Sequence, residues 1–294
     1  MSRSYFAVVG DPVRHSASPR MHAAAYRLLG LDCVYDAIHA TAEELPSVIA
    51  RLRSGELSGL NVTLPHKERV LALVDAVDES ARAANAANTL VRNAAGQLVA
   101  YNTDVTALAD ELRDLAGKAS VAAWSERHVL ILGTGATARS AVLALGRDLG
   151  VARITVRGRA LIDDERRAAL RAELRGRLAL AGCSAELACE PWFPSETTER
   201  SVGAIVQATS LGMTGWGAGE VTRDVVAWKV VSKSCVALDV VYGASRTAFV
   251  VAAKAHGLRT ADGRGMLARQ GARAFSLWFG RGEVLAVMRA ALDD

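Results

Sequence analysis

Short apolar runs alternate with helix-like stretches along the first hundred residues. Tyr5–Val9 predicts a buried strand that ends at Gly10, and Cys33–Ile38 predicts a second strand. Between them, Ser18 and Pro19 predict a helix start, with the serine as N-cap and the proline at the first helical position. This alternation of strand and helix is typical of an α/β layer.

The following segments add an antiparallel part to this layer. Gly59–Val62 predicts a short strand, and we expect a helix after Pro65. Two strand-like runs, Thr89–Arg92 and Gln97–Tyr101, flank the turn sequence Asn-Ala-Ala-Gly and predict a hairpin. The first domain is therefore expected to be an α/β domain with at least one antiparallel addition.

A second series of strands and helices begins near His128. Val129–Leu132 predicts a strand, a glycine-rich loop and a helix follow it, and Arg153–Val156 predicts the next strand. Ala204–Gln207 and Val236–Val240 predict later strands of the same sheet. A strand, a glycine loop and a helix in this order predict a Rossmann-type dinucleotide-binding domain.

The glycine loop has the pattern G-x-G-x-x-A. The first glycine allows a tight turn, the second lets the backbone approach a pyrophosphate, and the small third residue lets helix and strand pack closely. The free N–H groups of the helix N-terminus would face the phosphates. We expect the pyrophosphate to be held by Gly133, Gly135, Ala136, Thr137 and Ala138. The alternative interpretation is a tight structural turn that binds nothing.

The end of the second strand favours NADP over NAD. NAD enzymes usually place an acidic residue about 20 residues past the loop, where it binds the ribose 2′-hydroxyl. This chain has Val156-Arg157-Gly158-Arg159 there and no carboxylate before Asp163. Two guanidinium groups suit a 2′-phosphate, so we expect Arg157 and Arg159 to bind it. The alternative is that one or both arginines simply face solvent.

Polar side chains gather where the strands of the first domain end. They lie in His15–Pro19, Asn61–Lys67, Asn88–Thr89 and Asn102–Asp104. Ligands of open α/β sheets bind beyond the carboxyl ends of the strands, and hydroxyl and amide groups can both donate to and accept from a polyhydroxylated ligand. Within this set, a lysine such as Lys67 could attract a carboxylate or move a proton.

These segments together resemble the shikimate dehydrogenase family over nearly the whole chain. Seven family motifs occur in the expected order, namely Gly10–Pro19, Asn61–Lys67, Ala86–Thr89, Asn102–Asp104, Gln207–Met213, Asp239–Tyr242 and Gly263–Gln270. The resemblance implies a cytoplasmic enzyme that uses NADP to interconvert 3-dehydroshikimate and shikimate, acting as a monomer or homodimer.

The resemblance also implies roles for individual residues. Lys67 and Asp104 would form the catalytic pair at the reacting hydroxyl. The substrate carboxylate would be bound by Ser16, Ser18 and Tyr242, and the ring hydroxyls by Thr63, Asn88, Asp104 and Gln270. Further cofactor contacts would come from Thr209, Met213 and Gly263. Residues 1–106, completed by C-terminal helices over 260–294, would form the substrate domain, and residues 107–259 the NADP-binding domain, with a cleft between them.

Several positions depart from the family pattern. Asn85 and Val105 each replace a glycine, and Gln207 replaces the first Asn of the N-A-T-S segment. In the cofactor loop, Arg157 is interpreted as the one residue kept from the usual N-R-T. Two alternatives therefore stay open: a dehydrogenase of quinate or another shikimate-like acid, and a non-catalytic sensor of such a metabolite or of a nucleotide.

Composition narrows the classes of partner. The chain has 294 residues and a net charge of only +4, with arginines scattered along it, which favours small anionic ligands over nucleic acid. No apolar run reaches the roughly 18 residues of a membrane span, so no membrane partner is expected. The four cysteines form no CxxC pair and no metal site is expected, so they indicate reduced thiols in a cytoplasmic protein.

Overall fold

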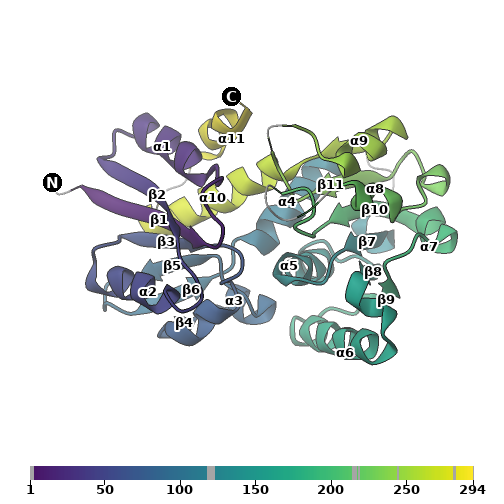
Figure 1. The fold of residues 1–294 in the computed structure, drawn as a ribbon, viewed down its shortest axis with the longest axis horizontal. Helices are drawn as coiled ribbons and strands as arrows, with labels where there is room; N and C mark the ends of the chain where they lie inside the picture. The colour runs from purple at the N-terminus through teal and green to yellow at the C-terminus, as the bar shows by residue number, and fades with distance from the viewer. Residues whose placement is uncertain are drawn as a thin grey trace. The chain divides into compact units, whose positions relative to one another are not determined.

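The chain divides into two compact units. The computed structural model describes residues 3–117, 123–213, 217, 219–243, 245–280 and 283–293. The first unit comprises Met1–Ala107 and Leu267–Asp294, and the second comprises Leu108–Met266. Both crossings between the units fall inside helices, α4 (Asp104–Ala116) and α10 (Gly263–Phe279), so no loop links the units at either crossing (Figure 1).

The first unit is built on a mixed sheet with the strand order β2-β1-β3-β5-β6-β4. Its strands are β1 (Ser4–Gly10), β2 (Cys33–His39), β3 (Gly59–Val62), β4 (Ala76–Val77), β5 (Thr89–Arg92) and β6 (Leu98–Tyr101). The first strand pairs in parallel with β2 and β3, whereas β5 runs antiparallel to β3 and β6. The predicted hairpin is confirmed, and it supplies the antiparallel part of the sheet.

Helices cover both faces of this sheet. They are α1 (Ser18–Leu28), α2 (Leu45–Ser54), α3 (Glu79–Ala84), the first-unit part of α10, and α11 (Leu285–Asp293). The helix predicted after Pro65 is a short 3-10 helix, Arg69–Leu73. The predicted N-cap role of Ser18 is wrong, because α1 begins at Ser18 after Ala17. Ser16 takes part of that role, since its Oγ accepts the Ser18 N–H at 3.2 Å.

The C-terminal helices return to the first sheet and are fixed there by aromatic packing. Phe275 of α10 is fully buried against Tyr26 of α1, and Phe6 of β1 packs on Trp278. The Trp278 indole N–H also donates to the Leu90 carbonyl of β5 at 3.0 Å. An apolar and a polar contact therefore both hold α10 in place, and α10 carries Gln270 toward the polar ends of the strands.

The second unit is a parallel sheet with the strand order β12-β11-β10-β7-β8-β9. Its strands are β7 (His128–Leu132), β8 (Arg153–Gly158), β9 (Glu186–Pro191), β10 (Val202–Gln207), β11 (Val236–Asp239) and β12 (Arg259–Ala261). Its helices are α5 (Ala136–Leu143), α6 (Asp164–Leu180), α7 (Glu196–Ser201), α8 (Glu220–Asp224) and α9 (Ala248–Ala255), beside parts of α4 and α10. The order reverses between β7 and β10, and ligands of doubly wound sheets bind at such a switch point.

The predicted fold class, two α/β domains of which one is of the Rossmann type, is confirmed by this architecture. Among the helices that the structure describes, none combines the length and the apolar character required to cross a membrane.

Candidate active site

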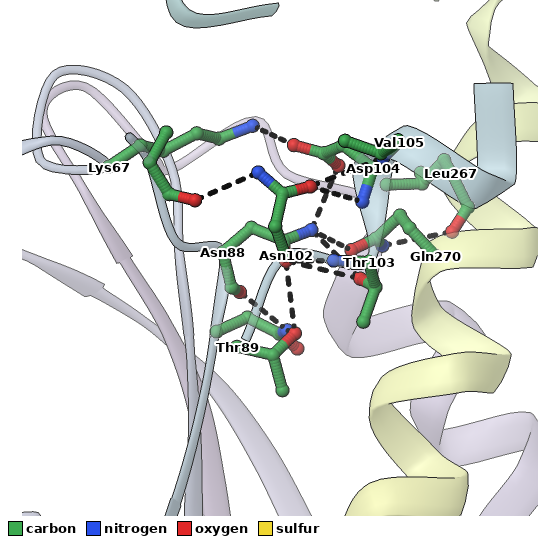
Figure 2. A network of polar contacts seen from close by, with 11 residues as sticks. Lys67, Asn88, Thr89, Asn102, Thr103, Asp104, Val105, Leu267 and Gln270 are labelled. Carbon is green, nitrogen blue, oxygen red and sulfur yellow. Dashed lines mark hydrogen bonds and ion pairs between the residues drawn. The ribbon is translucent and has the colours of Figure 1, made fainter. Parts of the chain in front are cut away.

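A buried ion pair lies at the centre of the first unit's polar cluster. Lys67 lies in the segment after β3, and Asp104 is the first residue of α4. The Lys67 Nζ is 2.7 Å from the Asp104 Oδ2, and the two side chains are only 12% and 6% exposed (Figure 2). The structure thus brings together the two residues predicted to form the catalytic pair. A lysine held this way is fixed in position yet keeps two further N–H directions for other partners.

Asn102 places Asp104 by capping the start of α4. Its Oδ1 accepts the backbone N–H groups of Asp104 at 3.0 Å and Val105 at 3.2 Å (Figure 2). Its Nδ2 donates to the Ala86 carbonyl at 2.9 Å. Because an asparagine at this position satisfies otherwise unpaired N–H groups, it fixes where the helix begins and where the carboxylate points.

Asn88 connects the ion pair to the C-terminal helix. Its Nδ2 lies 2.8 Å from the Asp104 Oδ1 and 3.2 Å from the Gln270 Oε1. Its Oδ1 accepts the Thr103 N–H at 2.8 Å, which fixes the orientation of the amide. The orientation of the Gln270 amide is also fixed, because its Nε2 donates to the Leu267 carbonyl at 2.9 Å. Both Asp104 oxygens therefore face donors, as a carboxylate requires.

Asn61 connects this network to Thr89 and Tyr35. Its Nδ2 donates to the Asn88 carbonyl at 2.9 Å and to the Thr89 hydroxyl at 3.0 Å. Its Oδ1 accepts the Tyr35 hydroxyl at 2.7 Å. Sequence reasoning gave no role of its own to Asn61 or Asn102. The available signal was an asparagine as the first residue of each motif: Asn61 inside the strand predicted over Gly59–Val62, and Asn102 directly after the strand predicted to end at Tyr101.

The other predicted substrate residues lie outside this network. In the described part of the chain, Ser16, Ser18 and Thr63 make no hydrogen bond to the Lys67–Asp104 pair. Ser18 is 6% exposed, and Ser16 and Thr63 are half-buried. Tyr242 is half-buried and belongs to the second unit. The proposed contacts of these four residues to a carboxylate or hydroxyls stay predictions.

The glycine loop of the second unit has the geometry that a dinucleotide needs. Gly133 has φ +122°, and a Cβ there would lie 2.9 Å from the Ala208 carbonyl oxygen, so only glycine fits. Gly135 precedes α5 as its N-cap, and a Cβ there would meet nothing within 4 Å. The helix therefore presents its first N–H groups beside open space, which fits a bound phosphate.

The remaining predicted cofactor residues lie near this loop or at a helix start. Thr137 and Ala138 are in the first turn of α5, which begins at Ala136. Thr209 and Met213 lie half-buried in the segment after β10. At the start of α10, a Cβ on Gly263 would lie 2.1 Å from the Val240 carbonyl oxygen, so close packing explains that glycine.

Arg157 does not have the role predicted for it. Its side chain is 0% exposed, with Nη1 2.8 Å from the Glu199 Oε1 and Nη2 2.6 Å from the Glu190 Oε2. Burial opposes its charge, but the hydrogen bonds that it donates to the two glutamates, and their negative charges, outweigh burial and raise the pKa of the guanidinium. Both terminal nitrogens are thus occupied by internal partners, and the prediction that Arg157 binds a 2′-phosphate is wrong for this structure.

The cause of the error is the length of β8. The strand runs to Gly158, two residues past the predicted end, and carries Arg157 into the core. Arg159 is the first residue after the strand and is exposed. Gly158 serves packing, since a Cβ there would lie 2.4 Å from the Thr134 methyl group of the glycine loop. Of the two arginines predicted to bind a 2′-phosphate, Arg159 remains as the candidate.

Comparison with known proteins identifies the family. A family model described as the shikimate dehydrogenase substrate binding domain matches residues 8–90. A shikimate dehydrogenase (NADP(+)) from Symbiobacterium thermophilum is 36% identical over 284 residues, covering 97% of this chain and 92% of the relative. One from an Anaeromyxobacter species is 39% identical over 287 residues, covering 98% and 95%. The chain belongs to the shikimate dehydrogenase family.

Solved structures from this family and beyond share the fold. The Thermus thermophilus shikimate 5-dehydrogenase, solved in complex with NADP(H) and shikimate, has a TM-score of 0.79 at 30% identity, covering 99% of this chain and 98% of that one. A ligand-free 5-ketofructose reductase from a Gluconobacter species has a TM-score of 0.83 at 28% identity, covering 100% and 99%. The fold therefore hosts more than one substrate, and the site residues must decide among them.

The buried position of Arg157 predicts a structural role. Arg157→Ala should lower the free energy of unfolding by about 3–5 kcal/mol, because it leaves the fully buried Glu199 carboxylate without its cationic partner. Urea unfolding of the ligand-free protein measures this. Arg159→Ala is the matched control and should stay within about 0.5 kcal/mol of the unsubstituted protein. Unchanged unfolding of Arg157→Ala would contradict the structural role.

Proposed function

We propose that the protein is an NADP-dependent shikimate dehydrogenase that interconverts 3-dehydroshikimate and shikimate. The observation that carries the proposal is the largely buried Lys67–Asp104 pair, whose carboxylate accepts from Asn88, which in turn contacts Gln270. A nucleotide sensor would not need a positioned proton carrier, whereas an alcohol dehydrogenase does. The names of the relatives, shikimate dehydrogenase (NADP(+)), support the same conclusion.

Lys67 would move the proton of the reaction. Oxidation of a secondary alcohol removes a hydride from carbon and a proton from oxygen, and NADP, when bound, supplies the hydride acceptor. Lys67 Nζ would take the hydroxyl proton in its neutral form and return it as an ammonium in the reverse direction. Asp104 would hold the lysine in place through the 2.7 Å contact, so that the Nζ points at the hydroxyl.

The substrate would bind to the first unit and the cofactor to the second. Ser16 and Ser18 would bind the substrate carboxylate, while Thr63, Asn88 and Gln270 would bind ring hydroxyls together with Asp104. The glycine loop would hold the pyrophosphate of NADP, with further contacts from Thr209 and Met213. The four cysteines are free thiols, which supports a cytoplasmic location, and we expect a monomer or homodimer.

One observation favours a second candidate function. Val105 is a buried side chain directly after Asp104, where the family pattern has glycine, so a side chain fills a position next to the catalytic pair that the family leaves without one. The similarity to a 5-ketofructose reductase also indicates that this fold accommodates other substrates. A dehydrogenase acting on quinate or another cyclic hydroxy acid is therefore the alternative. A panel of such acids, assayed with NADP and with NAD, separates the two.

The proposed role of Lys67 predicts a loss of turnover. Lys67→Ala should lower kcat for shikimate oxidation by about 100-fold or more, with KM changed by a modest factor, because proton transfer acts in the transition state. The measurement is NADPH formation from shikimate and NADP at steady state. Lys254→Ala, which removes an exposed lysine, is the control and should keep kcat. A near-normal kcat in Lys67→Ala would remove Lys67 from the mechanism.

The exposed position of Arg159 predicts its part in cofactor choice. Arg159→Ala should raise KM for NADP by about tenfold or more, since a charge-assisted hydrogen bond contributes about 1.5–3 kcal/mol. NAD has no 2′-phosphate, so its KM should barely change. Arg166→Ala, an exposed arginine of α6, is the control. Equal use of NAD and NADP by the unsubstituted protein would disprove the cofactor assignment.

A further inference from the structure

The Gln207 side chain sits inside the turn that follows its own strand. Gln207 ends β10 and is 0% exposed. Its Oε1 accepts the Thr209 N–H at 2.5 Å, and its Nε2 lies 3.3 Å from the Leu211 carbonyl oxygen. The Thr209 hydroxyl closes the same turn by accepting the Leu211 N–H at 3.1 Å. One side-chain amide therefore satisfies a donor and an acceptor of the turn.

Asp239 decides which way this amide faces. It ends the neighbouring strand β11, and its Oδ1 accepts the Gln207 Nε2 at 3.1 Å and the Val241 N–H at 2.9 Å. Its Oδ2 accepts the Thr247 hydroxyl at 2.6 Å. A carboxylate accepts only, so the nitrogen of Gln207 must face Asp239, and its oxygen must then face Thr209.

A carboxylate at this position is costly and is retained only with several donors. Asp239 is 0% exposed, and burial raises its pKa to about 7, with the nearby Asp262 acting in the same direction. The hydrogen bonds from Thr247, Val241 and Gln207 oppose that rise. Loss of one donor would therefore leave an unsatisfied buried charge and disturb the turn that Gln207 holds.

The turn held by Gln207 also packs against the glycine loop. A Cβ on Gly133 would lie 2.9 Å from the Ala208 carbonyl oxygen and 3.1 Å from the Thr209 methyl group. The turn thus packs so closely against Gly133 that no side chain fits between them. A shift of the turn would change this contact with the glycine loop.

We propose that Gln207 and Asp239 are a positioning pair that holds the segment from Ala208 to Met213 in the conformation that receives NADP beside the glycine loop. The proposal rests on the NADP-dependent function proposed above. Neither residue is expected to touch the cofactor, because both side chains are fully buried under the turn. The pair acts through the Thr209 N–H and the Leu211 carbonyl.

Removal of either partner tests this proposal, with a conservative change as the matched control. Gln207→Leu removes every hydrogen bond of the amide, and Asp239→Ala removes the acceptor that orients it. Each of these two changes should raise the NADPH dissociation constant by about tenfold, as expected for a lost hydrogen bond to a charged group. Asp239→Asn keeps an acceptor oxygen for Gln207 and Val241 and turns its nitrogen toward the Thr247 hydroxyl, which can accept. It should therefore stay within about threefold of the unsubstituted protein.

Two readouts separate positioning from general stability. Fluorescence titration gives NADPH affinity, and steady-state assays should show KM for NADP rising while KM for shikimate changes less than about twofold. Hydrogen exchange of the 207–213 segment without NADP should be faster in Gln207→Leu and Asp239→Ala, and should stay slow in Asp239→Asn. Thr155→Val is the control, since it removes the 2.8 Å contact to the His128 Nε2 elsewhere in the same sheet. It should lower thermal stability without changing either readout.

Several outcomes would overturn the proposal. One is that Gln207→Leu and Asp239→Ala lose thermal stability as Thr155→Val does while NADPH affinity and hydrogen exchange stay unchanged. Another is that Asp239→Asn is as impaired as Asp239→Ala. If Gln207→Leu and Asp239→Ala do not fold, Thr247→Val replaces them, because it removes one donor to Asp239. It should raise the NADPH dissociation constant while Thr247→Ser does not, and equal affinities would overturn the proposal. An inactive unsubstituted protein would contradict the proposed function. Hydrogen exchange would still test whether Gln207 and Asp239 order the 207–213 segment.

Discussion

The arrangement of the first unit depends on the ion pair between Lys67 and Asp104. Removal of two charges from water costs several kcal/mol per ion, and the mutual attraction offsets this only if other polar groups satisfy the remaining atoms. Asn88 supplies one such group, at 2.8 Å from the second oxygen of Asp104. Asn102 fixes the backbone that carries the carboxylate. The polar residues around the pair are therefore needed to keep the two charges buried, in addition to the role in substrate binding proposed for them.

This requirement connects distant parts of the chain. Asn88 and Gln270 are 182 residues apart in sequence, yet their amides meet at 3.2 Å. The meeting depends on α10, which Phe275 and Trp278 anchor on the first sheet. In the second unit, the same principle holds at Asp239, a buried carboxylate whose donors order the turn beside the glycine loop. Each unit thus uses one buried carboxylate to fix the segments proposed to carry its ligand.

Sequence patterns predicted the parts of the structure that local physics decides. The apolar runs of β1, β3, β7 and β10, the hairpin of β5 and β6, and the glycine loop each have a period or turn residue of their own. The pairing of Lys67 with Asp104 was suggested by the polar residues at the strand ends and implied by the family resemblance, and the structure brings the two side chains together. The position of Arg157 was not predicted, because a charged residue after an apolar run predicts the end of a strand, and its burial depends on tertiary contacts with Glu190 and Glu199. The short elements β9, β12 and α7 were not predicted, because they have no clear apolar period.

The central claim is that Lys67 and Asp104 act as one unit in moving the proton. The most direct test is a double-mutant cycle on kcat for shikimate oxidation, with Lys67→Ala, Asp104→Asn and the two combined. If the two residues act together, kcat of the combined variant should be about as low as that of Lys67→Ala alone, because the aspartate has no lysine left to hold. Losses that multiply in the combined variant would show that the two residues act independently, and would contradict the account.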